Sequence, residues 1–343
     1  MEDPNGIMVI SIDVELSWAR EGSDGRRRHE ELADARRAVP ILLDLFSDYG
    51  VRATWAMVGF LFCHCRDEIL ENLPPRLPTY QNTRRSNYAR LATIGETEAD
   101  DPYHYAPSLI EQIAECPGQE VASRSFANFN CYDPGQDEED FAADLQAAIC
   151  VARRRGIMLR SFVFPHNRVR HDYLETCRRA GITAYRGRPR VWPYDVEDGD
   201  ESSRIGDRIR GLARRLDAVA PITGSRCVLD ETSVVEMPVN VCATRRLQPL
   251  RGRSRWLVPL RRHRIFRDLD CAAHEGKIFH LWWHLRDLGV GLEDELDEMR
   301  RLLDRFAGWR RLQRLESVTM HEVVMGRRER PEGGFPQGRA RSL

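Results

Sequence analysis

Several side chains that could transfer protons or bind an anion stand at the ends of apolar runs in this sequence. Asp13 and Glu15 close the first run. Arg124 and Asn128 follow another, and His284 closes a third. Carboxylate and imidazole groups act as bases and acids near neutral pH, whereas a guanidinium stays protonated and binds anionic oxygens. These residue types therefore predict acid and base chemistry on a polar molecule.

Arg124 and Asn128 have the spacing of a metal-binding motif without its ligands. They are four residues apart, so one tight turn of backbone presents both side chains on the same side. Two histidines at this spacing would make a metal site. A guanidinium has no lone pair to donate, and an amide oxygen is a poor ligand for zinc-like ions. We expect Arg124 instead to place a positive charge near Asp13 and Glu15.

Strands and helices alternate along the chain, which is typical of an α/β fold with parallel strands. Short apolar runs predict strands at residues 7–13, 52–62, 119–123, 161–164, 182–186 and 277–283. Helical periodicity predicts helices at about residues 29–50, 107–114, 137–155, 171–180 and 289–306. Ligands in such folds bind at the carboxyl ends of the strands. Asp13, Arg124, Asn128, His166 and His284 are therefore expected in one cleft.

Composition predicts a folded globular protein that does not use the bilayer as a partner. The chain has 343 residues, 42% of them hydrophobic, and no apolar stretch as long as a membrane span. Its nine cysteines have no regular spacing, and the N-terminus shows neither a basic leader nor a long apolar run. We expect a cytoplasmic protein with reduced thiols. Cys63-His64-Cys65 could suggest a metal site, but structural cysteines are the favoured interpretation.

Three other segments differ from the rest of the chain in composition. Residues 66–108, rich in proline and polar residues, predict a surface excursion or a lid. Residues 244–267 are strongly basic, and we favour an amphipathic helix with a solvated face over a nucleic-acid site, because aromatic residues are sparse there. Residues 326–343 predict a disordered tail. One domain is expected over residues 5–325, acting on a small molecule.

Five stretches together carry a family resemblance. They are ISIDVELSW at residues 10–18, RATWAMVGFLF at 52–62, EVASRSFANFNCY at 120–132, SFVFPHN at 161–167 and FHLWWHLRDLG at 279–289. Their order and spacing resemble the polysaccharide deacetylase family, the chitooligosaccharide-deacetylase-like domains of carbohydrate esterase family 4, from about residue 7 to about residue 325. The resemblance implies an irregular (β/α) barrel of about seven parallel strands.

The resemblance also assigns expected roles. In the family, an Asp and two His hold a divalent metal, an Asp acts as base, and a late His protonates the leaving amine. Asp13 matches the base, and Val14 stands at the position of the metal aspartate, which leaves Glu15 as a stand-in. Arg124 and Asn128 fall on the two metal histidines, so we predict no catalytic metal and no other cofactor.

The remaining candidates line the expected cleft. His280, Trp282 and His284 alternate onto one face of a strand. Either histidine could be the acid; His284 is preferred, with His280 as support. His166 falls where the family often has arginine. Trp282 is expected to wall the cleft, and Trp192 and Tyr194 to line a ligand.

Three functions are compatible with these residues. The first is a metal-independent acid/base enzyme on a deacetylase scaffold, with Asp13 or Glu15 as base, His284 as acid, and Arg124 and Asn128 orienting a small amino-sugar-like or specialised-metabolite substrate. The second is a metal-dependent N-deacetylase with an altered ligand set. The third is a non-catalytic binding protein that keeps the fold.

Overall fold

The computed structural model describes residues 5–19, 26–188, 227, 237–249, 252–289 and 291–329. Its strands form one parallel sheet in the order β6-β5-β4-β3-β2-β1-β8-β7, with β9 paired to the first residues of β1. The strands are β1 (Gly6–Val14), β2 (Ala53–Met57), β3 (Gln119–Ser123), β4 (Ser161–Phe162), β5 (Ala184–Tyr185), β6 (Val239–Asn240), β7 (Arg245–Arg246), β8 (Ile278–His284) and β9 (Leu315–Ser317).

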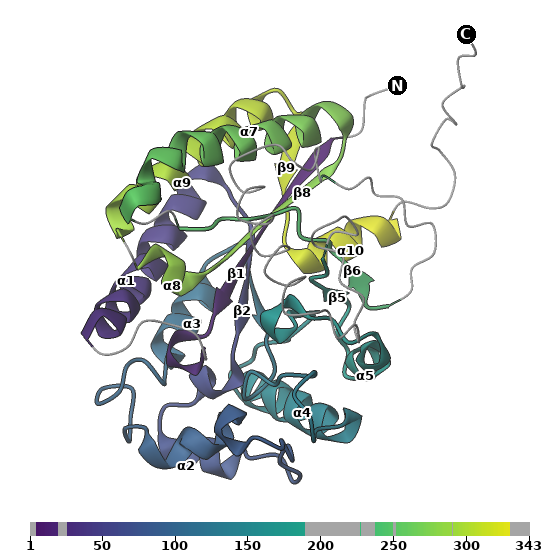
Figure 1. Ribbon diagram of the computed structural model, residues 1–343. Coiled ribbons are helices and arrows are strands. Elements are labelled where there is room, and N and C mark those ends of the chain that lie inside the picture. The colour runs from purple at the N-terminus through teal and green to yellow at the C-terminus, as the bar shows by residue number, and fades with distance from the viewer. Residues whose placement is uncertain are drawn as a thin grey trace, which may run out of the picture.

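Helices surround this curved sheet, with α7, α9 and α1 along one side of it (Figure 1). The helices are α1 (Arg26–Tyr49), α2 (Arg66–Glu71), α3 (Pro107–Glu115), α4 (Glu138–Arg154), α5 (Leu174–Arg179), α7 (Val258–Glu275), α8 (Leu285–Leu288), α9 (Leu292–Arg311) and α10 (Met320–Glu329). The α/β fold with parallel strands is confirmed as an incomplete barrel. It has nine described strands rather than about seven, because the short strands β6, β7 and β9 carry too few residues to show a pattern.

Local signals explain where the main helices begin and end. Asp137 accepts a hydrogen bond from the Asp140 backbone, and Asp140 returns one to the Asp137 backbone, which is a capping box at the start of α4. Gly50, which follows α1, has a φ of 59°, a left-handed conformation that suits glycine and ends a helix. Helix α1 therefore ends just before strand β2, and helix α4 begins after the loop that follows strand β3.

The concave face of the sheet changes from apolar to polar toward the carboxyl ends of its strands. Small apolar side chains from neighbouring strands, Val9, Ala56, Ala122, Val163 and Ala184, pack together inside the curve. Val9, Ser11 and Asp13 share a face of β1, since alternate residues of a strand point the same way. The Asp13 carboxylate therefore lies on the concave face, two positions beyond Ser11.

Two segments differ from expectation, and a third contains short helices. Helix α7 starts only at Val258, and Arg245–Arg246 form strand β7, so the basic stretch 244–267 is not one helix. Helix α10 continues to Glu329, so residues 326–329 are helical, while 330–343 lie outside the described residues. Residues 66–108 contain α2 and two 3-10 helices, Thr83–Arg85 and Tyr88–Thr93, and are packed against the rest of the chain.

No helix in the described ranges combines the length and the apolar composition needed to cross a bilayer.

Candidate functional site

Two arginines enclose the Asp13 carboxylate at the carboxyl end of β1. Arg124 Nη1 lies 2.7 Å from Asp13 Oδ2, and Arg124 Nη2 lies 2.7 Å from Glu15 Oε1. Arg186, just after β5, places its Nη2 2.7 Å from the same Asp13 oxygen. The side chains of Asp13 and both arginines are at most 1% exposed. The expected contact of Arg124 with both carboxylates is present, and Arg186 adds a second cation that the sequence analysis did not identify.

The loop after β3 has the backbone shape that brings Asn128 to the same carboxylate. Ser125 and Asn128 have positive φ angles of 66° and 55°. The carboxylate of Asp144, in α4, accepts a 2.7 Å hydrogen bond from the Phe126 amide and holds the loop. Asn128 Nδ2 then lies 3.2 Å from Glu15 Oε1. The four-residue spacing of Arg124 and Asn128 therefore does direct both side chains to one place, through a loop rather than a helical turn.

His284 closes the charged group at its more accessible end. Its Nδ1 lies 3.0 Å from Glu15 Oε2 and 3.6 Å from Asp13 Oδ2. The side chain is 15% exposed, compared with 7% for Glu15. Strand pairing explains the contact, because Asp13 of β1 is directly opposite His284 of β8. With Nδ1 directed at the carboxylate, Nε2 is the ring atom left to meet a ligand.

Charge balance decides the ionisation of both carboxylates. Burial alone would raise the pKa of Asp13, but the charges of Arg124, Arg186 and His284 hold it below its ordinary value. Burial opposes ionisation of Glu15 as well, yet the neighbouring cations, Arg124 first among them, hold its pKa well below the usual range. Both carboxylates are therefore ionised and paired, which makes them weak proton acceptors.

His280 does not occupy the position expected of a ligand-contacting residue. Its side chain is fully buried. Its Nε2 lies 2.7 Å from Ser11 Oγ, and its Nδ1 lies 3.0 Å from the Val241 carbonyl oxygen. Burial lowers its pKa to about 3, so the ring is neutral. Ser11 in turn accepts a hydrogen bond from Arg186, so His280 supports the arginine and does not contact His284 or a ligand.

His166 is also displaced from the site. It is exposed and has a φ of 58°, and this local turn directs its neighbour Asn167 inward instead. The Asn167 side-chain oxygen accepts hydrogen bonds from Arg186 Nε at 3.0 Å and Nη2 at 2.6 Å. The residue of this loop that serves the charged group is therefore Asn167, which orients Arg186.

Trp282 forms the wall of the site beside His284. The ring centroids of Trp282 and His284 are 5.7 Å apart. The Arg186 guanidinium lies 4.3 Å from the Trp282 ring centroid, and that of Arg246 lies 5.3 Å from it. Trp192 and Tyr194, also expected to line the ligand, lie outside the described residues.

The residues present do not fit a divalent metal ion. Each carboxylate that could coordinate one is already bonded to a guanidinium, and an added ion would lie beside two fixed positive charges. Within the ranges that the structure describes, no group of three or more His, Cys, Asp or Glu side chains is arranged to hold a metal. Of the Cys63-His64-Cys65 run, Cys63 is buried and His64 Nε2 lies 3.0 Å from Arg155 Nη1.

Residues 66–108 contact the site loops directly through Asn87. This side chain is 3% exposed. Its Nδ2 donates to the Trp18 carbonyl oxygen at 3.1 Å and to the Ala127 carbonyl oxygen at 2.9 Å. Trp18 follows Glu15, and Ala127 precedes Asn128. The segment is therefore attached to both of these loops.

Replacement of this asparagine should loosen both loops. Asn87→Ala leaves the buried Ala127 carbonyl without its donor and the Trp18 carbonyl with only the 3.4 Å contact from Asn128 Nδ2, so we expect the free energy of unfolding to fall by about 1–3 kcal/mol. Urea denaturation followed by circular dichroism measures the change. Arg84→Ala, an exposed position in the same segment, should stay within about 0.5 kcal/mol of the wild type. Equal stability of both variants would contradict the proposed anchor.

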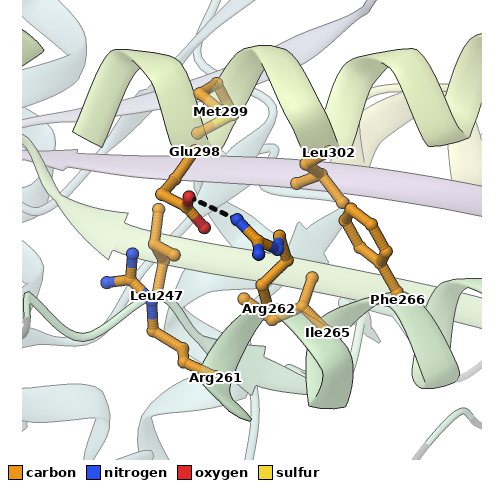
Figure 2. A pocket seen from close by; sticks show the side chains of 8 residues that line it. All are labelled: Leu247, Arg261, Arg262, Ile265, Phe266, Glu298, Met299 and Leu302. Carbon is orange, nitrogen blue, oxygen red and sulfur yellow. Dashed lines mark hydrogen bonds and ion pairs between the residues drawn. The ribbon is translucent and has the colours of Figure 1, made fainter. Parts of the chain in front are cut away.

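A separate small cavity lies between α7 and α9 (Figure 2). Its volume of about 10 Å³ is close to the space that a single water needs. Arg262 Nη1 lies 2.8 Å from Glu298 Oε1 across its wall, which closes it further. This cavity is too small for an organic ligand.

Comparison with solved structures identifies the fold. A candidate polysaccharide deacetylase from Mycobacterium smegmatis superimposes with a TM-score of 0.54 and 14% identity, over 96% of this chain and 92% of its own. A probable polysaccharide deacetylase from Pseudomonas aeruginosa PAO1 superimposes with a TM-score of 0.54 and 12% identity, over 94% of this chain and 90% of its own. A 4-alpha-glucanotransferase from Thermococcus litoralis superimposes with a TM-score of 0.51 and 11% identity, over 94% of this chain but 40% of its own. No family model and no curated protein matches the sequence. These likenesses over nearly the whole chain show that it has the polysaccharide deacetylase fold.

Proposed function

We propose that the protein is a metal-independent acid/base enzyme in which His284 transfers the proton. The contact that carries the proposal is the 3.0 Å approach of His284 Nδ1 to Glu15 Oε2. A carboxylate bound to one ring nitrogen fixes the orientation of the imidazole and directs the other nitrogen toward a substrate. His284 is also the most accessible titratable group of the cluster, which suits a residue that must touch its substrate.

Glu15 and Asp13 then position groups rather than accept protons. Glu15 orients His284, and Asp13 holds Arg124 and Arg186 together. This assignment differs from the role of base expected for Asp13, because a carboxylate bonded to two guanidiniums is a poor proton acceptor. Asn128 and Arg124 shape the floor below the imidazole.

Proton transfer, dehydration, cyclisation or acyl transfer from an activated substrate fits these residues. Hydrolysis of an unactivated amide normally needs a strong electrophile at the carbonyl oxygen. Both guanidiniums of the cluster already bind carboxylates, so neither supplies that electrophile. We therefore favour a small polar substrate, amino-sugar-like or from specialised metabolism, over a polysaccharide amide.

A non-catalytic binding protein is the second candidate, and burial favours it. Four charged groups pair with one another with between 0% and 7% of each side chain exposed, as in a structural network. On this alternative, His284 would only complete the network. The metal-dependent N-deacetylase is a weaker alternative, because Arg186 would remain beside Asp13 even if another ligand set formed.

Metal analysis tests the metal-independent proposal. Protein purified from cells grown with added zinc and then desalted should hold less than about 0.1 equivalent of zinc, cobalt or nickel, because two guanidiniums repel a divalent ion. Turnover of a panel of activated esters and N-acetylated amino sugars should be unchanged by EDTA. Stoichiometric metal with EDTA-sensitive deacetylation would establish the N-deacetylase instead.

A further inference from the structure

All three nitrogen atoms of the Arg186 guanidinium donate hydrogen bonds within the site. Nε donates to Asn167 Oδ1 at 3.0 Å, and Nη1 donates to Ser11 Oγ at 2.9 Å. Nη2 donates to Asp13 Oδ2 at 2.7 Å and to Asn167 Oδ1 at 2.6 Å. The Trp282 ring centroid lies 4.3 Å from the guanidinium carbon. A guanidinium bonded through every nitrogen keeps one orientation, so its charge is fixed beside Asp13.

The hydrogen bonds behind Ser11 run in one direction. Arg186 can only donate, so Ser11 Oγ accepts from it. The Ser11 hydroxyl hydrogen is then available to His280 Nε2, 2.7 Å away, and His280 Nδ1 donates to the Val241 carbonyl oxygen at 3.0 Å. This arrangement requires the neutral form of His280, which its burial favours. The chain of contacts therefore holds Arg186 without adding a second charge behind it.

Arg186 and His284 meet at the same atom, Asp13 Oδ2. Arg186 Nη2 lies 2.7 Å from this oxygen, and His284 Nδ1 lies 3.6 Å from it. The imidazole is closer to the other carboxylate, with Nδ1 3.0 Å from Glu15 Oε2. Because a guanidinium already occupies the Asp13 oxygen, Asp13 competes weakly for the imidazole. The ring therefore pairs with Glu15, and that pairing sets the direction of Nε2.

The charges of the buried cluster balance only with Arg186 present. Asp13 and Glu15 carry two negative charges, and Arg124 is shared between them, with one nitrogen 2.7 Å from each. Arg186 is paired with Asp13 alone. Without Arg186, two carboxylates would share one guanidinium, and His284, within 3.6 Å of both, could restore the balance by taking up a proton.

The charged groups of helix α8, which begins directly after His284, do not replace Arg186. Asp287 Oδ2 lies 2.9 Å from Arg246 Nη2 of β7, so this carboxylate has its own cation. Arg286 is the other charged residue of α8. In the part of the chain that the structure describes, the arginines paired with Asp13 are Arg124 and Arg186.

We propose that Arg186 is a positioning residue for proton transfer, which occupies Asp13 and thereby keeps a neutral His284 imidazole paired with Glu15. The proposal rests on the proposed function, since it concerns how His284 is prepared for that reaction. A residue that transfers a proton must take it up and release it near the working pH. An imidazolium held between two underbalanced carboxylates would release its proton too reluctantly to act as a base.

NMR of the histidine rings tests this assignment without a known substrate. Protein labelled with ¹⁵N at histidine gives ring signals that report which nitrogen carries a proton and at which pH the ring becomes charged. The His284 signals are assigned with His284→Gln. The neutral ring of the wild type should carry its proton on Nδ1, toward Glu15. In Arg186→Gln the proton affinity of the ring should rise at least about tenfold, because Asp13 has lost its own cation.

Three further variants make the test specific to this arginine. Arg186→Lys keeps the charge and should restore part of the wild-type proton affinity. Asn167→Ala keeps Arg186 but removes its Asn167 contacts, so the proton affinity should rise by less than in Arg186→Gln; this variant also serves if Arg186→Gln does not fold. Arg261→Gln breaks another buried pair, Arg261 Nη2 with Glu295 Oε2 at 3.0 Å between α7 and α9, and should leave the His284 signals within about twofold of the wild type.

The ring signals do not depend on turnover, so the two proposals fail separately. An unchanged His284 proton affinity in both Arg186→Gln and Asn167→Ala would overturn the positioning role, as would an equal change in Arg261→Gln. A wild-type ring with its neutral-form proton on Nε2 would also overturn it. If the expected shifts appear but His284→Gln turns over as the wild type does, the proposed reaction is wrong while the coupling between Arg186 and the imidazole stands.

Discussion

Arg124→Met should lower the free energy of unfolding by about 3–5 kcal/mol, the range found when one partner of a buried ion pair is removed. The arginine contacts Asp13 and Glu15 at 2.7 Å each, and its side chain is 1% exposed. Methionine fills similar space but provides no positive charge. Asp13 keeps Arg186, whereas Glu15 loses its main cation, so most of the loss should come from Glu15. Urea denaturation at pH 7.5 measures it.

The stability difference between Arg124→Met and the wild type should change with pH in a defined direction. In the wild type, both carboxylates have a lowered pKa, so their stabilisation is present above the ordinary values and is lost as the pH falls through the lower folded values. In Arg124→Met, burial should instead raise the pKa of Glu15 above its ordinary value. The free-energy cost of the buried, ionised Glu15 in the variant exists only at higher pH and is relieved when the carboxylate is protonated. The difference between variant and wild type should therefore shrink between pH 7.5 and pH 5.

Two controls separate charge pairing from other effects of the substitution. Arg178→Met removes an exposed arginine that is paired with Glu175, and it should cost less than about 1 kcal/mol. Adding Glu15→Gln to Arg124→Met removes the unpaired charge and should recover part of the loss. A loss below 1 kcal/mol in Arg124→Met, or a loss that grows toward pH 5, would contradict the charge-balanced cluster.

The sequence was sufficient for the parts of the fold and site that depend on local pattern. The strand that ends at Asp13 and the strand that ends at His284 are both long apolar runs, and their pairing brings the two side chains to one edge of the sheet. Arg124 was linked to Asp13 and Glu15 by its charge, and Asn128 was linked to Arg124 by its spacing. Their convergence needed only the rule that parallel strands end at one edge.

The sequence analysis missed Arg186 and Asn167, because their roles depend on contacts between distant segments. Arg186 follows a strand of only two residues, and its segment does not indicate which residue it pairs with, although it reaches Asp13, 173 residues earlier. The arginine at the end of the predicted strand 182–186 was a usable signal, because that end also faces the cleft. The exchange of His166 for Asn167 depends on positive φ angles at both residues, which the sequence does not specify.

His280 shows the limit of reasoning from strand alternation. Alternation correctly places it on the same face as Trp282 and His284. Alternation does not tell how deep a side chain lies in the barrel. His280 is two positions before Trp282 in the strand, and at that depth Ser11 and the Val241 carbonyl close the interior. Only the assembled sheet distinguishes a histidine at the mouth from one in the core.

His284→Gln should reduce kcat by about 10²–10⁴-fold, the usual contribution of a positioned acid or base. Glutamine is polar and similar in reach, so it can keep a hydrogen bond to Glu15, but it cannot take up or release a proton near neutral pH. KM should change little, because a residue that acts only on the proton in the transition state lowers kcat without altering ground-state binding. The measurement is steady-state turnover of 4-nitrophenyl acetate and of any other ester that the substrate panel identifies.

A matched histidine and a chemical rescue make the test specific to proton transfer by His284. His263→Gln makes the same chemical change at an exposed position of α7 and should leave kcat within twofold. His284→Ala should lose activity similarly and regain part of it with added imidazole, because the small base can enter the space that the side chain vacates. A structural role for His284 would give no rescue. Equal turnover by His284→Gln and the wild type would show that the imidazole only completes the buried charge network, and the proposed proton transfer by His284 would be wrong.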